Sequence, residues 1–114
     1  MTTLRNRVQL VGNLGMDPEI KAFDNGRKLA KFTVATNETY NGVNGQERTE
    51  TQWHNIIAWG KQAEIAAKNL HKGNEVALEG RITYRQYEDK NKQTRYITEI
   101  VLNNYLVYPG AKKQ

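Results

Sequence analysis

Cysteine is absent from this chain of 114 residues, so disulfide bonds, thiolate nucleophiles and cysteine-ligated metals are excluded. Histidine is scarce as well, because His54 and His71 are the only two, and the sequence therefore favours no zinc site and no other metal site. No apolar run approaches membrane-spanning length, and the opening MTTLRNRVQL lacks the apolar stretch of a secretory signal. These absences predict a soluble protein of the cytoplasm that needs no cofactor.

Acidic residues are fewer than basic ones. The chain has 17 Lys and Arg against 12 Asp and Glu, which gives a net charge of +5 at pH 7. An excess of this sign favours a polyanionic partner such as nucleic acid or an anionic membrane, although charge alone does not decide whether such a partner exists. The length is that of one domain, which we place at residues 1–108, before a short polar end at residues 109–114.

Alternating apolar and polar residues predict five strands in this chain. They are residues 7–15, 28–37, 51–60, 75–87 and 95–108. The segment ETYNGVNGQERTE, residues 38–50, has two Asn-Gly pairs and few apolar residues, which predicts a long, mobile hairpin loop. Residues 16–27 carry Pro18 and the turn pair Asn25-Gly26, and residues 88–94 are expected to form a polar hairpin tip.

The period changes in the segment KQAEIAAKNLHKG, which begins at Lys61. Its apolar residues at i, i+3, i+4 and i+7 make one helical stripe, formed by Ala63, Ala66, Ala67 and Leu70. The Lys72-Gly73 pair supplies the usual stop at the end of a helix. Three strands, one helix and two strands are the layout of the OB-fold. We therefore predict an all-β protein with one short helix, a five-stranded Greek-key barrel whose helix lies between the third and fourth strands.

The third predicted strand carries both tryptophans of the chain. Trp53 and Trp59 lie six residues apart, so their side chains share one face, and His54, Ile56 and Ala58 occupy the other. Parity alone does not say which face is the core. Either choice leaves apolar surface outside the barrel, and such a surplus is typical of a binding surface or a subunit contact.

The fourth predicted strand combines rings and cations on one side. Its inward register is expected to hold Val76, Leu78, Ile82 and Tyr84. Gly80, in the middle, predicts a bulge or a sharp bend of the barrel. The opposite register places Tyr87 beside Arg81 and Arg85. Aromatic rings between basic residues suit single-stranded nucleic acid, because unpaired bases stack on rings while cations neutralise the phosphates.

Several blocks of the sequence resemble those of a known family. In order, they are NRVQLVGNLGMDPEI, KFTVATNETY, TQWHNIIAWGKQAE, HKGNEVALEGRITYRQYED and RYITEIVLNN. Together they span about Asn6 to Asn104 and are similar to the bacterial single-stranded DNA-binding protein family. The resemblance implies an OB-fold that binds and protects single-stranded DNA with little sequence preference, in replication, repair and recombination near the nucleoid. It also implies a homotetramer, or at least a dimer, with no membrane partner.

The resemblance also implies the site residues of this chain. The base-stacking rings would be Tyr40, Trp53, Trp59 and Tyr87. The candidate phosphate contacts are Lys61, Lys72, Arg81, Arg85 and, as a weaker candidate, Lys31. His54, which follows the tryptophan of TQWH, takes a place near a subunit contact. The resemblance thereby implies that the tryptophan face of the third strand contacts DNA. Parity alone does not decide between the two faces.

One departure from the family concerns the end of the chain. Family members usually continue into a long flexible tail with an acidic tip that recruits replication and repair proteins. This chain closes on YPGAKKQ, which is basic. We therefore expect a short form without the acidic tail, either natural or truncated, and we do not expect recruitment of partners through such a tail.

Two other functions compete with DNA binding. A metal-dependent nuclease would need a carboxylate cluster, and the candidates Asp17, Glu19, Asp24, Glu88 and Asp89 all fall in predicted turns. The glycine-rich VGNLG lacks the Gly-Lys-Ser/Thr ending of a phosphate loop, so no enzyme is predicted. The second alternative is an OB-fold scaffold of the primosome type that works through protein contacts. Such a scaffold does not need rings at all four stacking positions, and this chain has them.

Overall fold

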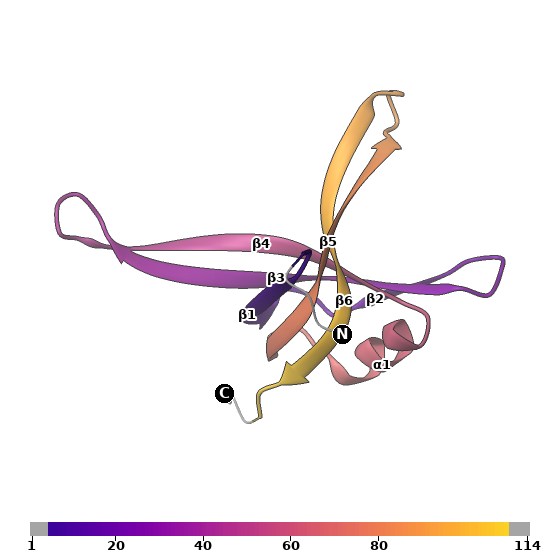
Figure 1. Cartoon of the computed structure of the whole chain (residues 1–114), viewed down its shortest axis with the longest axis horizontal. Helices are drawn as coiled ribbons and strands as arrows, with labels where there is room; N and C mark the ends of the chain where they lie inside the picture. Colours follow the sequence, from indigo (N-terminus) through magenta and orange to yellow (C-terminus); the bar gives the residue numbers. More distant parts are fainter. Residues whose placement is uncertain (1–4, 110–114) are drawn as a thin grey trace.

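The computed structural model describes residues 5–109, and residues 110–114 of the expected polar end lie outside the described residues. Six strands and one helix follow one another along the chain (Figure 1). They are β1 (Val8–Leu14), β2 (Glu19–Ala22), β3 (Lys28–Asn41), β4 (Glu47–Trp59), α1 (Lys61–Asn69), β5 (Glu75–Glu88) and β6 (Thr94–Val107).

The strands close into a barrel. Their order is β1-β5-β6-β4-β3-β2, and β1 also pairs with β3 through Asn13 and Leu14, which closes the sheet into a ring of five strands. All pairs are antiparallel except β4 with β6, which run parallel at Ile56 and Ile100. The predicted OB-fold barrel of five strands with one helix is confirmed by this closure.

The short strand β2 is the one element that the sequence pattern does not predict. It pairs with β3 at Lys28 to Lys31, just beyond the residues where β1 pairs with β3, so β1 and β2 follow one edge of β3 in succession. Pro18 lies between the two strands. With β2 counted, the helix lies between β4 and β5, which is still after the third of the five barrel strands.

The core fills the barrel with side chains from one register of each strand. Its largest fully buried members are Phe32, Ile56, Leu70, Val34 and Val76. Phe32 and Ile56 are direct cross-strand neighbours. Helix α1 adds three of the four residues of its predicted stripe to the same core, since Ala63, Ala66 and Leu70 are fully buried while Ala67 is only partly buried. Small alanine side chains let the helix lie close to the strands.

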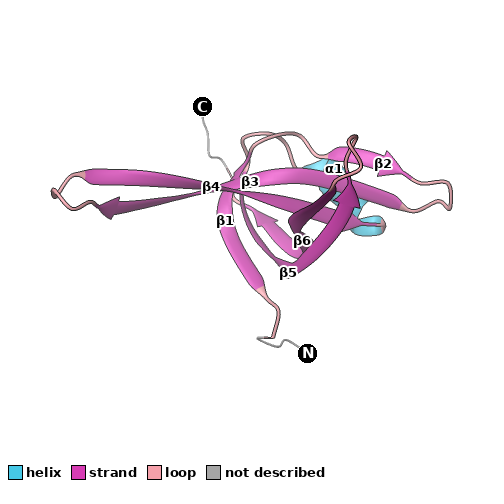
Figure 2. Ribbon diagram, turned by 90° about the horizontal axis from the view of Figure 1, so that it is seen from above, coloured by secondary structure: helices cyan, strands magenta, loops and turns pink. Residues whose placement is uncertain are grey.

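Two hairpin arms project from the barrel in Figure 1, and Figure 2 shows the β3–β4 arm from above. The β3–β4 arm is paired as far as Asn41 and Glu47, so the prediction of a long loop over residues 38–50 is wrong. Polar cross-strand contacts line this arm, including a bond of 2.6 Å from the Thr51 hydroxyl to the side chain of Asn37. The tip comprises residues 42–46 alone. The β5–β6 arm is paired as far as Glu88 and Thr94, close to the predicted tip.

Strand β5 changes its surroundings along its length. Its pairing with β6 shifts register between Glu79 and Gly80, which confirms the predicted bulge. A Cβ at Gly80 would lie only 2.3 Å from the carbonyl oxygen of Val101, so the close strand approach requires glycine here. Tyr84 was expected to face the core but is 77% exposed. The inward register ends at Ile82, because beyond it β5 leaves the barrel and enters the arm.

Candidate nucleic-acid interface

The structure shows which face of β4 packs in the core and which face is outward. Ile56 and Ala58 are fully buried in the core, so Trp53 and Trp59 lie on the outer face. Trp53 is 62% exposed, whereas Trp59 is partly buried. The Trp53 ring lies against the bend that follows β1, where a Cβ at Gly15 would come within 2.5 Å of it. Glycine at this place leaves room for the ring beside the backbone.

An apolar row with charged ends crosses the outer face of the barrel. Lys31 of β3 pairs with Ile57 of β4, which pairs with Val101 of β6, which in turn pairs with Arg81 of β5. Ile57 and Val101 are buried, while Lys31 and Arg81 are exposed. The row therefore places two buried apolar side chains between two exposed cations on the outer face of the barrel. Exposed cations beside aromatic rings suit a single strand of nucleic acid, whose bases stack on rings and whose phosphates are negatively charged.

A hollow of about 340 Å³ lies next to this row, and we call it the outer groove. Its lining residues are Lys21, Phe23, Leu29, Lys31, Ile57, Trp59, Arg85 and Glu99. Three of them are cations and two are aromatic. Among the predicted site residues, the structure thus brings Lys31, Trp59 and Arg85 together in one groove. Tyr87 follows Arg85 in the same register of β5, with its ring centre 5.9 Å from the Arg85 guanidinium.

A buried carboxylate holds Arg85 in the outer groove. The Arg85 guanidinium donates hydrogen bonds of 3.1 and 2.8 Å to the two carboxylate oxygens of Glu99. These hydrogen bonds raise the pKa of Arg85 above its ordinary value, against the smaller opposing effect of burial. The Glu99 carboxylate therefore fixes the orientation of the Arg85 side chain, keeps it charged and neutralises part of its charge.

The remaining predicted contacts are dispersed over the surface. Tyr40 lies in the opposite register of β3 from Lys31, out on the β3–β4 arm, where it pairs with Arg48 and lines a separate hollow of about 240 Å³. Lys61 begins α1, and Lys72 follows the helix in a loop. Both lysines are exposed and stand outside the outer groove. These residues share no single pocket with Trp59.

His54 lies in the inward register of β4, at the end of the barrel where the arms diverge. Its Nε2 is 3.0 Å from the hydroxyl of Thr36, and the ring is partly buried. It also lines a hollow of about 460 Å³ that extends to Tyr96 on the β5–β6 arm. A subunit contact at His54 remains a prediction.

Sequence reasoning missed two side chains that contact Trp59. The Phe23 ring stacks on Trp59 with ring centres 6.0 Å apart and 26° between the planes. The Arg27 guanidinium lies 4.5 Å from the centre of the Trp59 ring. A signal for both was present in KAFDNGRK, where an aromatic residue stands among cations in a turn. The buried Glu99 was missed as well, because no local pattern distinguishes it from an exposed strand residue.

The carboxylates considered for a nuclease site are not assembled into one. Asp17 accepts a hydrogen bond of 2.8 Å from the backbone of Lys72, and Asp89 is bonded to Arg95 within its own hairpin tip. Within residues 5–109 no group of three or more His, Asp or Glu side chains is placed to hold a metal ion. The only helix of the described chain has nine residues and is too short to cross a membrane.

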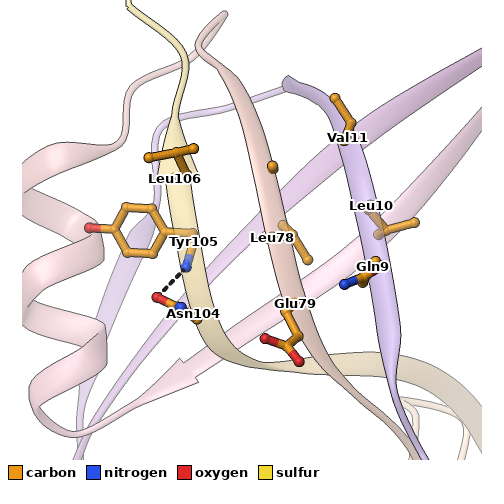
Figure 3. Close-up of a pocket in the computed structure, with 9 residues that line it drawn as sticks. Gln9, Leu10, Val11, Leu78, Glu79, Asn104, Tyr105 and Leu106 are labelled. Atoms are coloured by element: carbon orange, nitrogen blue, oxygen red, sulfur yellow. Dashed lines mark hydrogen bonds between the residues drawn. The ribbon is translucent and has the colours of Figure 1, made fainter. Parts of the chain in front are cut away.

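A second surface lies on the outside of β1, β5 and β6, and Figure 3 shows its residues. Val11 pairs with Ala77, which pairs with Leu106, so an apolar row crosses three strands. Val11 is 54% and Leu106 62% exposed, at a hollow of about 310 Å³. Glu79 lies in the neighbouring polar row and forms an ion pair of 2.7 Å with Arg7. We call this surface the β1–β5–β6 face.

Comparisons with known proteins find similarity over nearly the whole chain. The model of the single-strand binding protein family matches residues 5–108. A solved structure of the Plasmodium falciparum SSB in complex with ssDNA is similar with a TM-score of 0.83 and 30% sequence identity, over 95% of this chain and 98% of that one. A deletion mutant of the single-stranded DNA binding protein from Thermus aquaticus is similar with a TM-score of 0.80 and 26% identity, over 93% of this chain and 51% of that one.

Proposed function

This chain belongs to the single-strand binding protein family, and we propose that it binds single-stranded DNA with little preference for base sequence. The observation that carries the proposal is the outer groove, in which the stacking residue Trp59 lies beside the cations Lys31 and Arg85. The Plasmodium falciparum SSB, whose structure was solved with ssDNA, shares this fold over nearly its whole length.

The chemistry follows from the arrangement of rings and cations. An unpaired base stacked on an exposed ring contributes about 1–3 kcal/mol to binding, and every base has a face that stacks. Trp53 is exposed enough to receive a base without moving core residues. Lys31 and Arg81 flank the apolar row and neutralise phosphates, which releases counterions. A paired duplex hides the faces of its bases and gains only the charge contribution.

We extend the proposal to the other predicted contacts. Bases stack on Tyr40, Trp53, Trp59 and Tyr87, and phosphates contact Lys31, Lys61, Lys72, Arg81 and Arg85. Because Tyr40 and Tyr87 lie on different arms, the DNA strand follows the surface of the barrel from one arm to the other. The protein binds and protects DNA without catalysis or a cofactor, and it serves replication, repair and recombination at the nucleoid in the cytoplasm.

Self-association belongs to the same proposal. The β1–β5–β6 face exposes Val11 and Leu106 in one row, and within residues 5–109 this edge of β1 is paired, with β3, only at Asn13 and Leu14. The first part of β1 thus has an edge open to another strand. A second copy of the chain, presenting the same face, covers the apolar row and pairs with this edge. We propose a homotetramer, or at least a dimer, with His54 near a further subunit contact.

Titration of a fluorescent oligo(dT) tests the proposed function. Binding should quench tryptophan fluorescence, because Trp53 and Trp59 stack on bases, and the affinity should fall as salt rises. A duplex of the same length is the control and should bind more weakly. Equal affinity for the duplex would refute the stacking mechanism, and an affinity that does not change with salt would refute the phosphate contacts.

A further inference from the structure

The turn between β2 and β3 is built against the end of β4. Within the turn, the Phe23 amide donates to the Arg27 carbonyl at 2.8 Å, and the Gly26 amide donates to the Phe23 carbonyl at 2.9 Å. Leu29, just after the turn, pairs directly with Trp59. The Gly60 amide adds a bond of 2.9 Å to the carbonyl of Lys28. The turn is therefore closed by its own hydrogen bonds and anchored to the strand that carries Trp59.

This anchoring gathers two rings and two cations. Phe23 stacks on Trp59, and the Arg27 guanidinium lies over the Trp59 ring. The Lys21 ammonium lies 5.4 Å from the centre of the Phe23 ring. Contacts of a cation with a ring face orient both groups, so the cluster is arranged before any ligand arrives. Lys21 and Arg27 are themselves exposed to solvent, and their charges are available to an anion.

The cluster changes which ring is open to a base. Trp59 is partly buried and has both Phe23 and Arg27 against its ring. Phe23 is 37% exposed and lines the outer groove together with Lys21 and Lys31. A base that enters the groove from solvent therefore meets Phe23 as an accessible ring, with Trp59 behind it and lysines at the rim.

We propose that residues Lys21 to Arg27 form, with Trp59, a binding site for one nucleotide of a single strand. In this site the base stacks on Phe23, Trp59 supports the stack, and Lys21 and Arg27 contact the neighbouring phosphates. The inference rests on the proposed DNA binding, and in the outer groove it assigns the stacked base to Phe23 instead of Trp59 and adds two cations. The turn between β2 and β3 lies at the opposite end of the barrel sheet from the β3–β4 arm (Figure 1). The site therefore lengthens the proposed path of the DNA strand over the protein.

Substitution of the ring is the first test. Phe23→Ala should weaken the binding of oligo(dT) by about 5- to 150-fold, the loss of one stacked base, while Phe23→Tyr should retain it. Ile65→Ala is the matched control, because Ile65 of α1 is an apolar residue with an exposed fraction of 42%, close to the 37% of Phe23, and it lies outside the outer groove. A Phe23→Ala variant that binds oligo(dT) like the unmodified protein overturns the inference.

Substitution of the cation is the second test. Arg27→Ala should reduce the slope of the logarithm of the binding constant against the logarithm of salt concentration by about 0.7, the value for one phosphate contact on a single strand. Arg27→Lys should keep the slope. Lys68→Ala removes an exposed cation from the last turn of α1 and should also leave the slope unchanged. An Arg27→Ala slope equal to that of the unmodified protein removes Arg27 from the site.

Photocrosslinking separates a direct contact from an effect on folding. Oligo(dT) with scattered 5-iodouracil bases should crosslink to the unmodified protein, and peptide mass spectrometry should find Phe23 among the modified residues. Crosslinks confined to other aromatic residues would overturn the inference even if the Phe23 variants fold poorly. Failure of the unmodified protein to prefer single strands would refute the proposed function itself, which keeps the two failures distinct.

Discussion

Arg85 and Glu99 form a two-point ion pair in which only one partner is accessible. The Arg85 side chain is about half exposed, whereas that of Glu99 is only 3% exposed. The guanidinium uses two of its donors on the carboxylate and keeps the rest for the outer groove. A buried carboxylate thus sets the direction of a cation that faces the proposed DNA path.

Loss of this pair should be visible in stability. Arg85→Ala leaves the Glu99 carboxylate buried without its partner, and the free energy of unfolding should fall by about 1–3 kcal/mol. Adding Glu99→Gln removes the unpaired charge, so the double variant should recover part of that loss. Urea unfolding measures both values. A double variant no more stable than Arg85→Ala would show that the buried charge is not the cause.

Trp53 should matter for binding and little for folding. Because its side chain is 62% exposed, Trp53→Ala should weaken oligo(dT) binding by about 1–3 kcal/mol with little change in melting temperature. Phe32→Ala provides the contrast, since a fully buried phenylalanine should cost about 3–5 kcal/mol of folding stability. If Trp53→Ala lowers stability as Phe32→Ala does while its folded fraction binds normally, Trp53 has a structural role.

Oligomer size should depend on the β1–β5–β6 face. The unmodified protein should sediment as a tetramer, or at least a dimer, at micromolar concentration. Leu106→Asp places a charge in the centre of the exposed row and should shift the protein toward smaller species. Val43→Asp changes an exposed apolar residue on the distant β3–β4 tip and should leave the size unchanged. Equal sedimentation of the Leu106→Asp variant and the unmodified protein would exclude this face as the interface.

Acid should loosen the tip of the β5–β6 arm. A hydrogen bond from Arg95 lowers the pKa of Asp89, and the amides of Gln93 and Asn91 lower it further. A carboxyl group with a lowered pKa in the folded state stabilises that state above its unfolded pKa of about 3.9, and the contribution is lost as pH falls through the folded pKa. This contribution to the stability of the tip should therefore be present at neutral pH and be lost only below about pH 3.9.

The titration of Asp89 by NMR measures this effect. Arg95→Ala should move its midpoint upward toward the ordinary value of an aspartate, because the largest cause of the shift is removed. Lys90→Ala changes a neighbouring exposed cation that makes no bond to Asp89 in the described tip, and it should move the midpoint less. An unchanged midpoint in Arg95→Ala would assign the shift to the backbone amides instead.

Local patterns in the sequence predict most of the barrel. In the predicted strand over residues 28–37, alternation places Ala30, Phe32 and Val34 in the core, as observed, and the stripe of α1 is correct for all its members except Ala67. These patterns are reliable because each segment packs one of its sides against the core, and the spacing of its apolar residues shows which side that is. Parity also shows that Trp53 and Trp59 share a face. Only the burial of Ile56 in the closed barrel decides that this face is outward.

The failures of prediction share a physical cause. Tyr84 continues the apolar register of β5, but the barrel ends before it, and where a layer stops depends on the other strands. Residues 38–50 have the composition of a loop, yet polar pairs such as Thr51 with Asn37 support a ladder without a core. The contacts of Phe23 and Arg27 with Trp59 join a turn to a distant strand, so no local period contains them.

The parallel pairing of β4 with β6 has a consequence for the order of folding. Each arm joins residues that are close in the chain, and such hairpins form in about 1–10 μs. The β4–β6 contact instead joins Ile56 to Ile100, so α1 and β5 lie within the loop that it closes. Closing that loop costs chain entropy before the core contacts are complete. We expect the rate of folding to be set by long-range closures of this kind, which include the pairing of β1 with β5, with both arms already formed when the barrel shuts.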